Sequence, residues 1–163
     1  MPAKTIYNFN KNSNFEDWTV VDDVVMGGQS AGNYYLSSEG FGVFEGNISL
    51  ANNGGFSSVR HNLNVAGIKS FNKIILTLKG DAKNYQFRIK SNLSERHSYI
   101  SSFHTSGELQ KIEISLEDMY PVFRGQKLDL PNFSDDSIQE ITFLIGNKEN
   151  ESFKLILDKI ELW

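Results

Sequence analysis

Two glycine-rich segments join turn residues to charged and amide side chains, and they are the chain's best candidates for a functional site. The first, residues 22–30, reads Asp-Asp-Val-Val-Met-Gly-Gly-Gln-Ser, and the second, residues 52–60, reads Asn-Asn-Gly-Gly-Phe-Ser-Ser-Val-Arg. Because glycine has no Cβ atom, paired glycines mark tight turns or close approaches of two backbones. The segments are then either plain hairpin turns or parts of one constructed surface. The polar side chains of that surface are Asp22, Asp23, Asn53 and Arg60.

Arg60 is the residue of the second segment that most needs a partner. In an extended segment it shares a face with Phe56 and Ser58. If Phe56 faces the core, the guanidinium group points inward or along the sheet edge and requires a carboxylate. Asp22 or Asp23 is the expected partner, so we expect the two segments to touch, with the glycine pair of the first segment allowing the approach. The contact would be either a structural lock or the wall of a polar pocket.

Catalytic motifs lack the surroundings that their chemistry requires. Residues 28–32 match the G-x-S-x-G motif of serine hydrolases, but that motif needs a helix after the serine, whereas residues 33–36 are strand-like. The adjacent aspartates at 22–23 and at 135–136 would point to opposite faces of a strand, so neither pair makes an acid–base dyad. The sequence therefore predicts that this chain is not an enzyme.

The length and composition indicate a single soluble domain over residues 1–163. The chain has no cysteine, which excludes disulfides and thiolate metal sites. Its first residues contain no apolar signal-peptide region, and no run of about 18 apolar residues predicts a membrane-spanning helix. We therefore expect a cytoplasmic protein without a transmembrane segment.

The charge pattern argues against nucleic acid as a partner. The formal net charge is −4, and basic residues do not alternate with aromatic ones as they do in strand-binding grooves. The densest basic group contains Lys83, Arg88, Lys90 and Arg96. Alternation places Arg88 and Lys90 on one strand face, which we interpret as a solvated sheet surface.

Hydrophobic residues recur with a period of two, which predicts an all-β fold. The regular alternation gives a set of expected core residues: Ile74, Leu76, Leu78, Tyr85, Phe87, Ile89, Ile112 and Ile114. Further strands are expected at 5–9, 17–21, 33–37, 41–50, 56–61, 97–103, 138–145 and 152–162. Many short strands and no long helix predict two packed antiparallel sheets, as a sandwich or barrel.

The last expected strand carries an irregularity. Phe153, Leu155 and Leu157 share one parity, whereas Ile160 and Leu162 have the other. A one-residue shift reverses the face of every later side chain, so we predict a β-bulge near residues 158–159. The alternative explanation is that Ile160 and Leu162 face a second buried layer on the other side of the strand.

The order of these motifs resembles the complex I intermediate-associated protein family. The resemblance is carried first by Trp18, Asp22, Asp23, Met26, Gly27, Gly28 and Ser30, and then by Phe44, Gly46, Asn52, Asn53, Gly54, Gly55, Phe56, Ser58 and Arg60. It continues through Gly80, Asp81, Arg124 and Gly125 to the 153–160 region, and so covers nearly the whole chain. The resemblance implies a galactose-binding-like jelly roll, related in shape to carbohydrate-binding modules.

Function follows less directly from this resemblance than fold does. Mitochondrial family members are assembly chaperones of respiratory complex I, so a non-catalytic module that binds or assembles a protein partner is our first hypothesis. The expected binding residues are Trp18, Asp22, Asp23, Met26, Ser30, Asn53, Phe56 and Arg60. The second hypothesis is a module for sugars or small ligands, whose aromatic and polar contacts would come from Trp18, Tyr34, Tyr35, Tyr99, Asn53 and Arg60. The sequence leaves the oligomeric state and the partner open.

A calcium site is a further expectation from the resemblance, and no other cofactor is implied. Many carbohydrate-binding modules of this shape hold a structural calcium ion between an N-terminal loop and the final strand. Oxygen donors suit this hard cation. The corresponding residues of this chain are Asn8, Asn10, Glu16 and Asp158.

Overall fold

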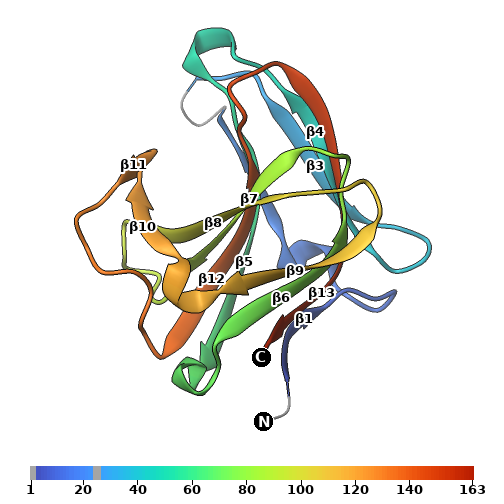
Figure 1. The fold of residues 1–163 in the computed structure, drawn as a ribbon. Helices are drawn as coiled ribbons and strands as arrows, with labels where there is room; N and C mark the ends of the chain where they lie inside the picture. The colour runs from blue at the N-terminus through green and yellow to red at the C-terminus, as the bar shows by residue number, and fades with distance from the viewer. Residues whose placement is uncertain (1–2, 24–26) are drawn as a thin grey trace.

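The computed structural model describes residues 3–23 and 27–163, with the side chain of Asn53 left out. These residues form two antiparallel β-sheets that pack face to face (Figure 1). Between the strands lie short 3-10 turns, η1 (Phe15–Asp17), η3 (Ala51–Asn53), η4 (Ile68–Ser70) and η5 (Leu116–Asp118). The predicted all-β, antiparallel sandwich is therefore confirmed.

The first sheet has six strands in the order β3-β4-β13-β6-β9, with β1 also paired to β13. Its strands are β1 (Lys4–Asn8), β3 (Ala31–Leu36), β4 (Gly42–Ile48), β6 (Lys73–Lys79), β9 (Leu109–Ser115) and β13 (Glu151–Leu162). The long strand β13 occupies the middle of this sheet. It pairs with β4 through its first half, with β6 through its second half and with β1 near its end.

The second sheet has seven strands in the order β11-β10-β8-β7-β12-β5-β2. Its strands are β2 (Thr19–Asp22), β5 (Ser57–Ala66), β7 (Asn84–Lys90), β8 (Ser98–His104), β10 (Tyr120–Phe123), β11 (Gln126–Lys127) and β12 (Ser137–Ile145). Neighbouring strands are mostly distant in sequence, as β12 and β5 show, so most pairings of this sheet are long-range.

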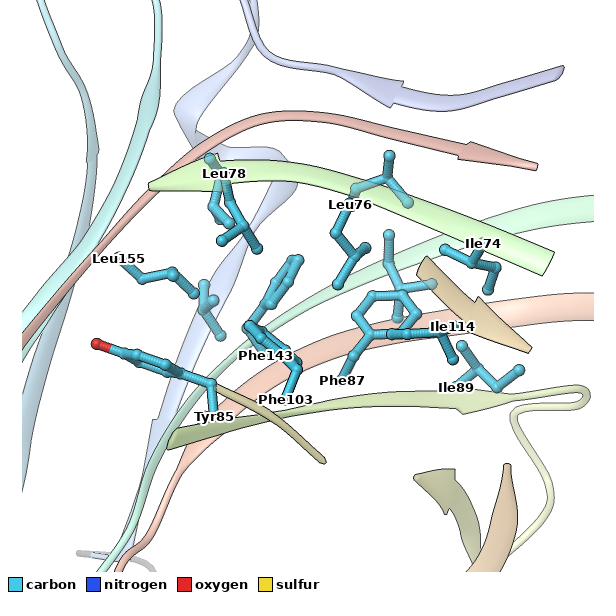
Figure 2. Close-up of a cluster of buried hydrophobic side chains, with 14 of the residues drawn as sticks. Ile74, Leu76, Leu78, Tyr85, Phe87, Ile89, Phe103, Ile114, Phe143 and Leu155 are labelled. Carbon is cyan, nitrogen blue, oxygen red and sulfur yellow. The ribbon is translucent and has the colours of Figure 1, made fainter. Parts of the chain in front are cut away.

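The core lies between the two sheets and follows the alternation that the sequence predicts. Figure 2 shows side chains of β6, including Leu76, directed toward Phe87 on β7 and Phe143 on β12. Seven of the eight expected core residues are buried; Ile112 is half-buried and packs against the core, because its strand β9 is at the sheet edge. Phe87 is fully buried while Arg88 is not, which confirms the predicted register of β7.

The predicted bulge in the last strand is confirmed. The register of β13 against β6 shifts between Leu157 and Lys159, so Asp158 is the extra residue. As a result Leu157 and Ile160 are both buried although their parities differ. Among the described residues, none of the helical segments is long and apolar enough to cross a membrane.

Candidate functional site

The two glycine-rich segments are joined by the carboxylate of Asp23, which is only 1% exposed. Its Oδ1 accepts a hydrogen bond from the Ser30 amide (2.9 Å). Its Oδ2 accepts three, from the Ser30 hydroxyl (2.5 Å), the Gly55 amide (2.6 Å) and the Phe56 amide (3.2 Å). Four donors from two distant segments thus meet on one side chain, and the expected contact between the segments is confirmed.

Asp22 makes a second junction beside the first. Its carboxylate accepts hydrogen bonds from the amide of Gly32 (3.0 Å) and from the hydroxyl of Ser57. Ser30 also accepts from the amide of Ser49 (2.9 Å), which ties the start of β3 to the end of β4. Ser30 is followed directly by strand β3, so the helix that the G-x-S-x-G motif of serine hydrolases requires is not found after it, as expected.

Glycine is required at these junctions because side chains approach the backbone closely. A Cβ atom on Gly28 would lie 2.4 Å from the Asp23 carboxyl group, and one on Gly54 would lie 2.6 Å from Asp23 Oδ2. Gly27 has a φ of +89°, which turns the chain between Asp23 and Ser30. Gly28 therefore leaves room for the Asp23 side chain within the first segment, whereas Gly54 permits the approach of the second segment, a role that we had expected of Gly27 and Gly28.

Hydrogen bonding keeps the buried Asp23 ionised. Burial alone raises the pKa of a carboxyl group, but the hydrogen bonds from Ser30, Gly55 and Phe56 favour the charged form more strongly and lower the pKa of Asp23 below its usual value. The junction is therefore a charge-assisted structural lock at neutral pH.

The expected partner of Asp23 was wrong. Among the described residues Arg60 forms no ion pair, and it lies on the face of β5 that points away from the core. The premise failed because Val59, not Phe56, is the core residue of this strand: Val59 is fully buried, whereas Phe56 precedes β5 and is only half-buried. Backbone amides, which no sequence pattern singled out, take the place of the guanidinium group.

The outer face of the seven-stranded sheet, where Arg60 lies, is hollowed into a groove. We define three adjoining hollows. The first, of about 450 Å³, is lined by Glu16, Asp17, Thr19, Arg60, Asn62 and Glu140, among others. The central hollow, of about 180 Å³, is lined by Arg60, Arg88, Lys90, Arg96, Arg124 and Glu140, among others. The third, of about 480 Å³, is lined by Gln86, Arg88, Ile100, Tyr120, Val122 and Lys127, among others. Because neighbouring hollows share Arg60, Glu140, Arg88 and Val122, they form one groove.

Strand register explains why the groove crosses the strands. One row of paired positions runs from β2 to β10, and its members are Thr19, Arg60, Thr142, Arg88, Ile100 and Tyr120. Side chains on one face of paired positions are neighbours. The row therefore presents polar and charged groups across the sheet, with the apolar Ile100 on β8 as the exception.

Apart from Arg60, the predicted binding residues whose side chains the structure describes do not line this groove. Trp18 is a core residue, 4% exposed, that stacks with Phe9 and packs against the tilted ring of His61. Tyr99 is also buried, and Tyr35 is exposed on β3 of the other sheet. Met26 lies outside the described residues, as does the side chain of Asn53. The aromatic set expected for a sugar ligand is thus spread over the core and both sheets.

The expected calcium ligands are only partly placed by the structure. The Asn10 side chain is used within its own loop, donating to the Asn8 carbonyl (3.2 Å) and accepting from the Asn12 amide (2.8 Å). Glu16 lines the first hollow, and Asp158 is the bulge residue of β13. No group of three His, Asp or Glu side chains within residues 3–23 and 27–163 is placed to hold a metal ion. The calcium set stays a prediction.

Sequence reasoning missed the groove because its residues come from distant strands. Arg88 and Lys90 were interpreted as a solvated surface, while Arg124, Tyr120 and Glu140 received no role. The available signal was the strict alternation of β7, which places Arg88 opposite the core face. Only the strand order brings Arg60 and Arg88 to either side of β12.

Comparisons with known proteins agree with this fold. One similar structure is the family 11 carbohydrate-binding module of a cellulosomal cellulase from Clostridium thermocellum. The two chains are 19% identical and superpose with a TM-score of 0.72, and the match covers 99% of this chain and 94% of the module. A structure of the Clostridium thermocellum module in complex with a β-1,3-1,4-mixed-linked tetrasaccharide gives 20% identity and a TM-score of 0.71, covering 98% of this chain and 94% of that one.

A third similar structure is an agarase, of which this chain covers only 24%, with 12% identity and a TM-score of 0.61. At these identities the likeness shows a shared jelly-roll fold. A search of curated proteins gives no match. The profile of Complex I intermediate-associated protein 30 (CIA30) matches residues 7–157. The chain therefore belongs to the CIA30 family.

Proposed function

We propose that this protein is a non-catalytic binding module that holds a protein partner in the groove of its seven-stranded sheet, in an assembly role of the kind that the family name describes. The observation that carries the proposal is the groove itself. It is open, crosses six strands and is lined mainly by polar and charged side chains. A partner segment of several residues would fit such a surface.

The rigidity of the groove supports a binding role. Its floor consists of paired strands, and their inward side chains Val59, Phe87 and Phe143 are fully buried. Sites built on strands hold their side chains in fixed positions, which limits the entropy lost on binding. The lock at Asp23 fixes the end of β2, and so stabilises one border of the groove.

A sugar ligand is the second candidate function. It is favoured by the similar carbohydrate-binding module whose structure contains a tetrasaccharide. The lining of this groove is less favourable, because Tyr120 and Phe123 are the only Phe, Tyr or Trp side chains among its described lining residues. A glycan would therefore depend mainly on hydrogen bonds.

Site-specific crosslinking separates the two candidates. A photoreactive phenylalanine analogue replaces Thr19, which is exposed in the first hollow, or Lys111, which is exposed on β9 of the other sheet. After irradiation in cells of the source organism, we expect a reproducible protein adduct from position 19 and none from position 111. Excess unlabelled protein should suppress the adduct, whereas a Tyr120→Ala competitor should suppress it less.

The contrary results are equally specific. Equal adducts from both positions would mean that capture does not depend on the groove. Saturable binding of an oligosaccharide in calorimetry, weakened by Tyr120→Ala and without any adduct from position 19, would favour the sugar candidate over the protein partner.

A further inference from the structure

We propose that the central hollow is a subsite for a doubly charged oxyanion, a phosphate or sulfate group, bound chiefly by Arg60 and Arg88. This inference rests on the proposed use of the groove, because it names the chemical group that the groove recognises. The shared chemistry is the oxyanion itself, which a phosphorylated partner, a phosphorylated sugar or free phosphate could carry.

The first support is the local charge. Five cationic side chains line the central hollow, namely Arg60, Arg88, Lys90, Arg96 and Arg124, and one carboxylate, Glu140, lies among them. The whole chain has a net charge of −4, so this concentration of positive charge runs against its composition. Within the described part of the chain none of the five forms an ion pair. Apart from Glu140, the described residues that line the central hollow include no Asp or Glu.

The second support is the register of the two arginines. Arg60 on β5 and Arg88 on β7 are both paired with Thr142 of the intervening strand β12. Two strand spacings separate their backbones by about 10 Å, so two long cationic side chains flank one hydroxyl group. Arg88 is half-buried, and its burial together with the neighbouring charge of Arg60 lowers its pKa. An anion between them would relieve this repulsion.

The third support is that Arg88 is already held in place. Its Nε and Nη2 donate to Oε1 of Gln86, at 3.0 and 2.7 Å. A guanidinium group has five N–H donors, so three remain for a ligand. Lys90 is fixed in a similar way by donating to the Glu95 carbonyl (3.0 Å). Preorganised donors lose little conformational entropy when a ligand binds.

The charge and the number of donors favour a tetrahedral oxyanion over a single carboxylate. A carboxylate offers two oxygens and one negative charge, whereas a phosphate group offers three or more oxygens and up to two charges. Arginine side chains bind phosphate oxygens through paired N–H donors. Two guanidinium groups on opposite sides of the hollow can engage different oxygens of the same group.

The acidic end of the groove, at the first hollow, argues against a long polyanion. The first hollow, next to the central one, contains the carboxylates of Glu16 and Asp17 as well as Glu140. A nucleic acid backbone that followed the whole groove would place phosphates against these acids. A single oxyanion in the central hollow avoids them, so hydroxyl or basic groups of the same ligand would lie toward Glu16.

Binding of inorganic phosphate and sulfate tests this inference. Titrations followed by calorimetry and by amide NMR shifts are run at constant ionic strength, with chloride and acetate as comparison anions. We expect saturable phosphate binding, with shifts centred on β5, β7 and β12, and at least tenfold weaker binding of acetate. Arg88→Gln and Arg60→Gln should each weaken phosphate binding about tenfold, whereas Lys111→Gln on the other sheet should change it less than twofold.

Arg60→Gln keeps the test valid if the Arg88 variant misfolds. Arg60 makes no side-chain hydrogen bond or ion pair among the described residues, so its replacement should leave the fold intact. Equal binding of chloride and phosphate, or equal losses in the Arg60 and Lys111 variants, would overturn the subsite. Titrations with a phosphoserine peptide and with glucose 6-phosphate identify the source of the oxyanion. The source is the class of ligand that binds more tightly than inorganic phosphate. Specific phosphate binding without a crosslinked partner would support the subsite and refute the protein-partner function. A crosslinked adduct without phosphate binding would refute the subsite and support the protein-partner function.

Discussion

Replacing Asp23 with asparagine tests the lock between the two glycine-rich segments. Asparagine has nearly the same shape, but one of its two terminal groups is an NH₂ donor. The best orientation keeps its oxygen at the three donors that now contact Oδ2, and places the NH₂ group against the amide of Ser30. The Ser30 amide and the new NH₂ group, which are both donors, then face each other without an acceptor, and the other three hydrogen bonds lose their charged partner.

The expected loss of stability follows from these contacts. A buried unsatisfied donor costs about 1–3 kcal/mol, and hydrogen bonds to a charged group contribute roughly 1 kcal/mol more than neutral ones. Asparagine also avoids the cost of burying a charge, which offsets part of the loss. We expect Asp23→Asn to lower the free energy of unfolding by about 3 kcal/mol, and the melting temperature by roughly 6–12 °C.

The pH dependence gives an independent check. Because the folded pKa of Asp23 is depressed, its contribution is present above the unfolded value of about 3.9 and is lost as the pH falls through the folded value. Urea unfolding at pH 7, 5 and 3 should therefore show the difference between the wild type and Asp23→Asn shrinking below about pH 4.

The matched control is Asp129→Asn, at an exposed position with no side-chain hydrogen bond in the described structure. It should change stability by less than about 0.5 kcal/mol at every pH. An Asp23→Asn protein that unfolds like this control at pH 7, or a difference that is the same at pH 7 and pH 3, would refute the charge-assisted lock.

Three further substitutions probe the same framework by thermal melting. Gly28→Ala places a Cβ atom 2.4 Å from the Asp23 carboxyl group and should cost about 2 kcal/mol or more; an unchanged melt would contradict the close approach. Tyr85→Phe removes the buried hydroxyl that donates to Asp81 at 2.8 Å and should cost about 2 kcal/mol. An unchanged melt would show that this hydrogen bond does not stabilise the fold. Arg60→Ala should change stability by less than about 1 kcal/mol, since it has no ion pair; a loss of 3 kcal/mol would restore the idea of a stranded carboxylate.

Much of the fold could be predicted from alternation, because burial on one face of a strand imposes a period of two on the sequence. Phe87 and Arg88 illustrate this, as does the bulge at Asp158, where the parity changes along a single strand. Ile112 deviates because an edge strand leaves one side of its residues less covered. That difference depends on strand order, which alternation does not contain.

The candidate site was predicted in part, and the reason lies in which atoms make it. Glycine spacing correctly indicated that the segments around Asp23 and Gly55 meet. The donors at that junction are backbone amides, which every residue carries, so the sequence offered Arg60 as a more visible but wrong partner. The groove depended on pairings such as Arg60 with Thr142, between residues far apart in the chain, and local patterns cannot specify these.

The central position of β13 has a consequence for synthesis on the ribosome. Strands β1, β4 and β6 emerge early, yet each hydrogen-bonds to residues 151–162, which emerge more than a hundred residues after β1. Closing a chain of about 150 residues costs roughly 4 kcal/mol in loop entropy, and contacts of such separation fold slowly. The six-stranded sheet therefore cannot close co-translationally from its N-terminal end. Until residues 151–162 are synthesised, the strand edges that pair with β13 stay open, and open edges of this kind favour aggregation.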